Sequence, residues 1–126
     1  MDKARILVVE DDPIISTDIL MTLLKAGFPV CEVVSSGDAA IEAAGRLLPD
    51  LVLMDVNVAG TLNGVDTARV LVTRYAVPSL FVSGTSEKTL AAAVDFPNMG
   101  LLRKPFMAAD LTEHVQAATA GARSLN

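Results

Sequence analysis

Short runs of apolar residues recur along the chain and alternate with segments of helical periodicity. The runs are continuous rather than interrupted by polar residues, which is typical of strands that are covered on both faces. The clearest runs are 6–9, 51–54 and 77–82, and weaker runs lie at 30–34 and 100–103. The pattern therefore predicts five strands packed between helices.

Helices are predicted between the first strands because apolar residues there recur at spacings of three and four. Asp12-Pro13 suits the cap and the first position of a helix that Gly27 ends. Ser36 is the expected cap of a second helix, and Asn63-Gly64 opens a third. The three apolar faces comprise Ile15, Ile19 and Leu23, then Ile41, Ala44 and Leu48, then Val65, Ala68 and Val72.

Two more helices are predicted in the C-terminal third of the chain. Ser86 is the expected cap of a short, alanine-rich fourth helix around Leu90 and Val94. A fifth helix begins near Phe106, with the apolar residues Met107, Leu111, Val115 and Ala118. Strands that alternate with helices form a parallel sheet with helices on both faces. The expected fold is therefore α/β, a doubly wound (βα)5 domain formed by residues 1–126 as a single unit.

Composition and charge narrow the class of protein. A formal net charge of −5 argues against a nucleic-acid or anionic-membrane partner, because both require a basic surface. The single cysteine, Cys31, allows no intrachain disulfide, favours a reducing compartment and is expected to be a small core residue. No apolar run is long enough to cross a membrane, and no signal peptide is recognisable. We expect a soluble, cytoplasmic protein with no nucleic acid and no membrane among its partners.

Candidate chemistry gathers where the predicted strands end. Glu10-Asp11 follows the first strand, Asp55 the third, Ser83 the fourth and Lys104 the fifth. In open α/β sheets, ligands bind beyond the carboxyl ends of the strands. Three acids at one edge repel one another unless a cation lies between them, and oxygen ligands suit Mg²⁺. Taken alone, Asp55 is also explained as a strand-end residue that caps the following loop. Ser83 taken alone is also explained as a loop hydroxyl bonded to the backbone. Only the combination of these residues indicates a functional site.

These residues, together with their neighbours, resemble the receiver domain of two-component response regulators. The resemblance covers residues 4–121, and one of its motifs alone would be a weak signal. In chain order the motifs are ILVVEDDP at 6–13, LVLMD at 51–55, Asn63-Gly64, FVSG at 81–84 and KPF at 104–106. The resemblance implies a flavodoxin-like, five-stranded parallel sheet with the strand order 2-1-3-4-5.

By this resemblance, Asp55 accepts a phosphoryl group from a phosphohistidine of a partner histidine kinase or phosphotransfer protein. Mg²⁺, or Mn²⁺ in its place, is held by Asp11, Asp55 and the backbone carbonyl of Asn57. Glu10 acts on the metal through water. The chain is then a phosphoryl acceptor and not a turnover enzyme.

The resemblance also assigns Ser83 and Lys104 to the phosphoryl oxygens, the first through a hydrogen bond and the second through an ion pair. The Lys104–Pro105 peptide is expected to be cis. His114, the sole histidine, is predicted to lie at the surface of the fifth helix, so the donor is another protein. We expect no output domain in residues 1–126, an unknown downstream protein as partner, and a monomer or weak dimer.

Three features depart from the common pattern of the family. Leu101 stands where many receivers have Tyr or Phe, Gly84 stands where alanine is common, and the loop after Asp55 is slightly longer than usual. Together with Leu101, residues 78–84 and 55–57 look similar to the atypical FAT GUY receivers. Because Leu101 supplies no aromatic ring, we hypothesise that phosphorylation reorders residues 84–100 instead.

Two other functions stay open from the sequence. Residues 55–57 faintly resemble the DxD start of haloacid-dehalogenase-type phosphatases, although that family carries its nucleophile on the first strand. The second is an interaction module that keeps the receiver fold but acts without phosphorylation. A purely structural domain has little need of the complete set Glu10, Asp11, Asp55, Ser83 and Lys104, which favours the acceptor.

Overall fold

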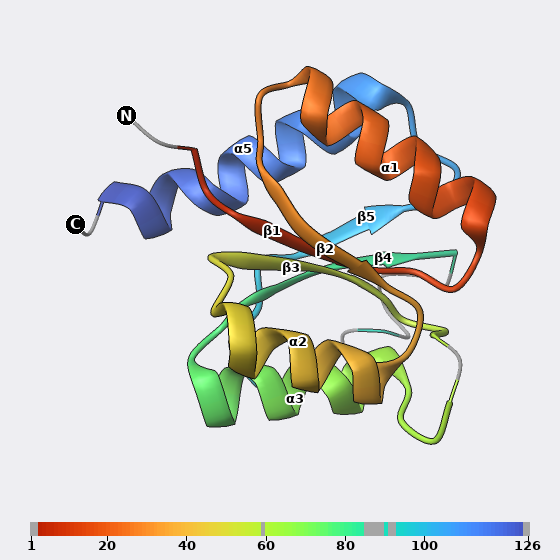
Figure 1. Ribbon diagram of the computed structural model, residues 1–126, viewed down its shortest axis with the longest axis vertical. Helices are drawn as coiled ribbons and strands as arrows, with labels where there is room; N and C mark the ends of the chain where they lie inside the picture. Colours follow the sequence, from red (N-terminus) through yellow and green to blue (C-terminus); the bar gives the residue numbers. More distant parts are fainter. Residues whose placement is uncertain (1–2, 59, 85–89, 91–92, 125–126) are drawn as a thin grey trace.

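A five-stranded parallel sheet forms the centre of the computed structural model, which describes residues 3–58, 60–84, 90 and 93–124. The strands lie in the order β2-β1-β3-β4-β5 (Figure 1). Their bounds are β1 (Ile6–Val9), β2 (Val30–Val34), β3 (Leu51–Asp55), β4 (Ser79–Ser83) and β5 (Leu101–Arg103). The predicted α/β class and the implied strand order are both confirmed.

In the described part of the chain, two helices lie on each face of this sheet (Figure 1). On one side lie α1 (Pro13–Lys25) and α5 (Ala108–Ser124), and on the other α2 (Gly37–Leu47) and α3 (Gly64–Tyr75). The predicted fourth helix falls mostly outside the described residues. None of the described helices is long and apolar enough to cross a membrane.

The helices begin at side chains that accept hydrogen bonds from backbone N–H groups left free by the first turn. Asp12 Oδ1 accepts bonds from the N–H groups of Ile14 and Ile15, at 2.9 and 3.3 Å. Ser36 Oγ and Asn63 Oδ1 cap α2 and α3 in the same way, at 3.1 and 2.8 Å. The three predicted caps are confirmed, and each fixes how the chain leaves the carboxyl edge of the sheet.

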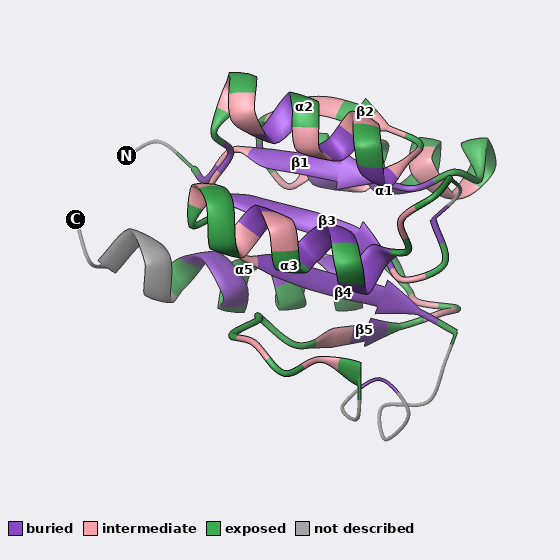
Figure 2. Cartoon of the chain, turned by 90° about the horizontal axis from the view of Figure 1, so that it is seen from below, coloured by how far each residue is buried: buried purple, intermediate pink, exposed green. Residues whose placement is uncertain are grey.

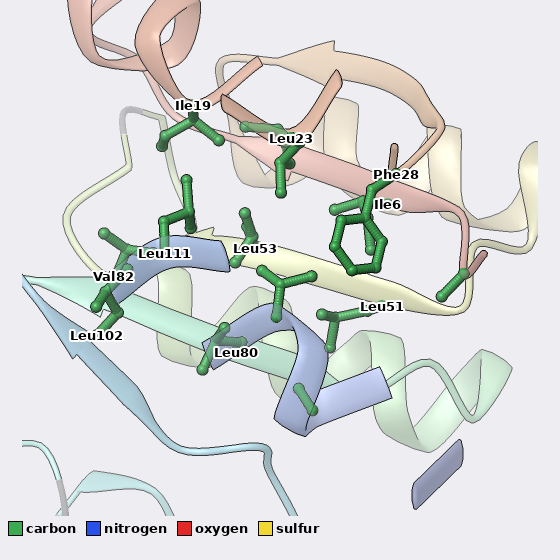
Figure 3. Packing of buried hydrophobic residues seen from close by; sticks show 14 residues of the cluster. Ile6, Ile19, Leu23, Phe28, Leu51, Leu53, Leu80, Val82, Leu102 and Leu111 are labelled. Atoms are coloured by element: carbon green, nitrogen blue, oxygen red, sulfur yellow. The ribbon is translucent and has the colours of Figure 1, made fainter. Parts of the chain in front are cut away.

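The core consists of two layers, because successive residues of a strand point to opposite faces of the sheet. Ile6 and Val8 of β1 pack beneath α1 and α5, whereas Leu7 and Val9 pack against α2 and α3. Figure 3 shows the first layer, in which Leu23 of α1 lies among side chains from the central strands. The central strands are buried throughout (Figure 2), so their ends are held by packing on both sides.

Strand ends differ slightly from the hydrophobic pattern. β4 begins at Ser79 rather than at residue 77, because Pro78 has no N–H to donate to the ladder. β3 runs one residue past its apolar run, so that Asp55 itself belongs to the strand and pairs with Val82. The acid is therefore held by sheet pairing rather than by a loop.

Two residues predicted on apolar helix faces lie elsewhere. Leu48 is the C-cap of α2 with φ of 46° and is 58% exposed, since the chain must reverse before Pro49. Met107 precedes α5 and is 72% exposed, while its N–H donates to Asp110 Oδ2 at 3.3 Å. Periodicity was wrong at both places because turn geometry, not side-chain spacing, sets where a helix ends.

Two further residues test the predicted burial. Cys31 is half-buried rather than fully buried, because β2 is an edge strand, and its Sγ lies 3.3 Å from the Ile6 carbonyl oxygen. This burial raises the pKa of the Cys31 thiol. His114 is exposed on α5, as predicted.

Adjacent leucines of α1 offer a matched test of this packing. Leu23 is fully buried and Leu24 is 51% exposed. Leu23→Ala should lower the free energy of unfolding by about 2–5 kcal/mol, because it leaves a cavity under α1. Leu24→Ala should lower it by less than about 1 kcal/mol. Urea unfolding of both variants measures the difference, and equal losses would contradict the arrangement of α1 on the sheet.

Candidate functional site

Four strand ends bring polar side chains to one edge of the sheet. Glu10 follows β1, Asp55 ends β3, Ser83 ends β4 and Lys104 follows β5. Because all the strands are parallel, these ends point the same way. The structure thus brings together the residues that the sequence predicted at this edge.

A single ammonium group lies between two buried carboxylates. Lys104 Nζ is 2.9 Å from Glu10 Oε1 and 3.5 Å from Asp55 Oδ1. Glu10 is only 3% exposed and Asp55 only 4%, while the lysine side chain is partly exposed. A buried carboxylate without a partner is unstable, so Lys104 offsets part of the penalty for both acids.

The pKa values of Glu10 and Lys104 reflect opposing effects. Burial raises the pKa of Glu10 above its usual range, although the Asp12 N–H bond at 3.1 Å and Lys104 act in the opposite direction. Burial on its own would lower the pKa of Lys104, but the ion pairs with Glu10 and Asp55 outweigh it and leave that pKa raised. Lys104 therefore carries its positive charge at neutral pH.

Three carboxylates converge at the edge. Glu10, Asp11 and Asp55 each offer an oxygen, and these oxygens lie within 4.8 Å of one another. Glu10 and Asp55 are buried, and Asp11 is exposed. Among the described residues, the basic group that forms ion pairs with these acids is Lys104, so a single ammonium faces three carboxyl groups. Hard oxygen donors with one side open to solvent suit a divalent cation such as Mg²⁺, so the residues present fit this metal.

The backbone that follows Asp55 folds back onto the acid. The Asn57 N–H donates to Asp55 Oδ1 at 3.1 Å, and the Gly64 N–H donates to the Val56 carbonyl at 2.9 Å. A Cβ on Gly64 would lie only 2.7 Å from the Cα of Val56 and would also overlap the Asp55 carbonyl oxygen. Glycine is therefore required at position 64 to let α3 begin against the acid.

Ser83 connects the ends of β4 and β5. It is fully buried, and its carbonyl accepts a hydrogen bond of 2.9 Å from the Lys104 N–H. The Lys104–Pro105 peptide is cis, as the resemblance implied. Arg103, by contrast, is exposed, so of the two consecutive basic residues only Lys104 belongs to the site.

One contact beside the site was not predicted from the sequence. Arg69 of α3 forms an ion pair with Asp95 at 2.5 Å, and its guanidinium lies 5.0 Å from the centre of the Phe96 ring. Phe96 in turn meets Phe81 of β4 edge-on, with ring centres 6.4 Å apart. The guanidinium holds the pKa of Asp95 below its usual range. Residues this far apart in the chain show no local pattern, and only a record of paired substitutions would have indicated them.

Arg69 also lines a small pocket of about 270 Å³ next to the acid-bearing loop, together with Asn57 and Leu90. Leu101, where an aromatic residue is common, is half-buried in the same layer of the core as Phe96. An aromatic side chain is therefore present in this layer, but it comes from the segment before β5. The proposed reordering of residues 84–100 concerns a segment that is described only at residues 84, 90 and 93–100.

Comparison with known proteins gives one consistent result. Residues 6–116 match the family described as "Response regulator receiver domain". The chain is 32% identical over 116 residues to the DNA-binding response regulator MtrA of Mycolicibacterium smegmatis, covering 91% of this chain and 50% of MtrA. It is 30% identical over 122 residues to the transcriptional regulatory protein PdtaR of Mycobacterium tuberculosis, covering 96% of this chain and 59% of PdtaR. The chain spans about half the length of these relatives.

Solved structures agree with this match. The signal receiver domain of a modulated diguanylate cyclase from Desulfovibrio desulfuricans G20 superposes with a TM-score of 0.89 at 28% identity, over 99% of this chain and 100% of that one. The receiver domain of the PhyR response regulator from Erythrobacter litoralis gives a TM-score of 0.83 at 26% identity, over 95% and 92%.

The close approach at Gly64 can be tested with a matched glycine. Gly64→Ala should lower the free energy of unfolding by about 1–3 kcal/mol, because the methyl group overlaps the backbone of Asp55 and Val56. Gly84→Ala is the control, since a Cβ there meets no atom of the described residues within 4 Å, and it should change stability by less than about 0.5 kcal/mol. Thermal unfolding compares the two, and a neutral Gly64→Ala would refute the packing of α3 on the acid.

Proposed function

The chain belongs to the response regulator receiver domain family, and from this premise we propose that it accepts a phosphoryl group on Asp55 from a phosphohistidine of a partner protein. The observation that carries the proposal is the ammonium of Lys104, which lies against both Asp55 and Glu10 at the carboxyl edge of the sheet. Asp55 is the acid that ends a central strand, so it is held rigidly at the point where a donor would approach. The donor is a histidine kinase or a histidine phosphotransfer protein.

In the proposed reaction, a carboxylate oxygen of Asp55 attacks the phosphorus, the bond from phosphorus to the imidazole nitrogen breaks, and the imidazole leaves with that electron pair. Phosphoryl transfer depends mainly on positioning and on neutralising charge. Lys104 is close enough to Asp55 to pair with the incoming phosphoryl oxygens, and we assign it this role. The Ser83 hydroxyl, at the end of β4, is proposed to donate a hydrogen bond to one of these oxygens.

Asp11 and Asp55 are the proposed direct ligands of Mg²⁺, with the backbone carbonyl of Asn57 as a third and Glu10 acting through water. Mn²⁺ is the alternative ion. The burial of Glu10 and the exposure of Asp11 support this division, because the exposed acid faces the side from which a hydrated ion arrives. The bound ion supplies positive charge that lowers the repulsion between the anionic acceptor and the anionic donor.

The downstream partner is proposed to be a protein, and the compartment the cytoplasm. MtrA is by its printed name a DNA-binding regulator, but this chain aligns with only half of it. The net charge of −5 supports protein contact rather than nucleic-acid contact. The narrower FAT GUY assignment stays a prediction.

Phosphoryl acceptance is tested by incubation with acetyl phosphate and Mg²⁺, followed by mass spectrometry of the intact protein. The wild type should gain one phosphoryl group, and Asp55→Asn should gain none. Asp12→Asn is the matched control, since Asp12 caps α1 and asparagine keeps that cap. A wild type that gains no mass would favour the phosphorylation-independent module instead.

The metal site is tested with the neighbouring acids Asp11 and Asp12, which are both exposed. A ligand at one hundred times its dissociation constant stabilises the folded state by about 2.7 kcal/mol, so Mg²⁺ should raise the Tm of the wild type. Asp11→Asn should lose most of this rise and Asp12→Asn should retain it. Equal responses of the two variants in a thermal scan would contradict the proposed ligand set.

A further inference from the structure

One guanidinium group joins the segment before β5 to helix α3. Arg69 forms an ion pair with Asp95 and lies over the ring of Phe96, so a single side chain of α3 contacts two consecutive residues of that segment. The arginine side chain is 44% exposed and that of Asp95 is 74% exposed. We name this pair of contacts the Arg69 clasp. None of its three residues belongs to the group of acids and lysine described above.

The clasp holds a stretch of chain that has few other polar contacts. In the described part of the chain, the ion pair with Arg69 is the polar contact that joins residues 95–98 to another element. Both side-chain hydrogen bonds of Asn98 reach residues only two positions away. Pairing with β4 begins at Met99, whose N–H donates to the Ser79 carbonyl at 2.9 Å. Without the clasp, this stretch would be held chiefly by the packing of its one aromatic ring.

That ring connects the clasp to the strand that ends at Ser83. Phe96 is half-buried and meets the buried Phe81 edge-on, with ring centres 6.4 Å apart. Phe81 lies on β4, two residues before Ser83. In the sheet it pairs with Met54, the residue that precedes Asp55. A movement at the end of β4 is therefore passed to the clasp through one contact between rings.

The loop that follows the acceptor reaches the clasp from a second side. Asn57 and Arg69 line the same pocket of about 270 Å³. The Asn57 N–H donates to Asp55 Oδ1 at 3.1 Å, so the position of this loop depends on the state of the acid. A phosphoryl group on Asp55 removes the carboxylate charge and offers this N–H group a different acceptor. Such a change alters the wall of the pocket that Arg69 shares.

The clasp is weak enough to open and close. An ion pair between exposed side chains and a cation–π contact at an exposed site are both among the weaker contacts of a folded protein. Together they favour the closed arrangement by a factor of only about 3 to 30. A preference of this size can be reversed by a change at the acid, because no buried charge has to move.

We propose that the Arg69 clasp is closed while Asp55 is unmodified and opens when Asp55 carries a phosphoryl group, which releases residues 95–98 from α3. This inference rests on the proposed phosphoryl acceptance and adds the contact through which the acid is read. The loop at Asn57 and the ring of Phe81 are the two routes from the acid to the clasp. Linkage requires the converse as well, so removing the clasp must favour the modified state by the factor with which modification opens it.

Fluorine NMR and calorimetry with beryllofluoride, which stands in for the phosphoryl group, test the proposal. The chain has four phenylalanines, so labelling with para-fluorophenylalanine gives four signals, and Phe96→Leu identifies the one from the clasp. Arg69→Gln should move this signal, and beryllofluoride with Mg²⁺ should move the wild-type signal to the same place. Beryllofluoride should have little further effect on this signal in Arg69→Gln. The variant should bind beryllofluoride more tightly than the wild type, by up to about 3- to 30-fold.

Arg74→Gln is the matched control. Arg74 is a second arginine of α3, lies over the ring of its neighbour Tyr75 and has no ion-pair partner among the described residues. This variant should match the wild type in the signal of Phe96 and in its affinity for beryllofluoride. The exchange of Arg69→Asp with Asp95→Arg restores the ion pair and should move the signal back toward the wild-type position. Circular dichroism verifies that each variant is folded.

Failure of the clasp and failure of the proposed function give different results. A wild type that binds no beryllofluoride in the presence of Mg²⁺ would argue against the acceptor site itself, and the clasp would fall with it. A wild type that binds beryllofluoride while the signal of Phe96 stays in place overturns the clasp alone. So does an Arg69→Gln variant that binds beryllofluoride with wild-type affinity, because linkage would then be absent.

Discussion

The structure depends on one electrostatic constraint, which is that two buried carboxylates share the ammonium of Lys104. Glu10 comes from the end of β1 and Asp55 from the end of β3, so their common partner must arrive from a third strand end, that of β5. Removing the lysine would leave two uncompensated charges in a buried position, which is strongly destabilising. These ion pairs require the ends of β1, β3 and β5 to lie at the same edge of the sheet.

Much of this arrangement was readable from the sequence because it is local. A continuous apolar run that stops at an acid predicts both a buried strand and a polar strand end, as at Asp55. The capping residues Asp12, Ser36 and Asn63 were equally readable, since each acts on N–H groups two or three positions ahead. The prediction that Leu48 lies on the apolar face of α2 was wrong, because the chain reverses at Leu48 in a left-handed conformation that hydrophobic spacing does not encode.

Other features could not be predicted because they join distant segments. Arg69 and Asp95 lie 26 positions apart, and each alone resembles an ordinary surface charge. In the structure, Arg69 of α3 contacts the segment before β5 through Asp95 and the ring of Phe96. Phe96 in turn packs edge-on against Phe81 of β4, in the same layer of the core as Leu101.

The hydrogen bond from the Gly64 N–H to the Val56 carbonyl has a consequence for engineering. This bond joins Val56, which follows the acid, to Gly64, the first residue of α3. The residues between them therefore form a loop whose two ends stay in place whatever the length of the loop. The entropy of closing such a loop changes by only about 0.6 kcal/mol for each doubling of its length. Gly60 and Thr61 are exposed within it. A reporter peptide inserted between them would be carried beside the acid while the strand that holds the acid stays in place.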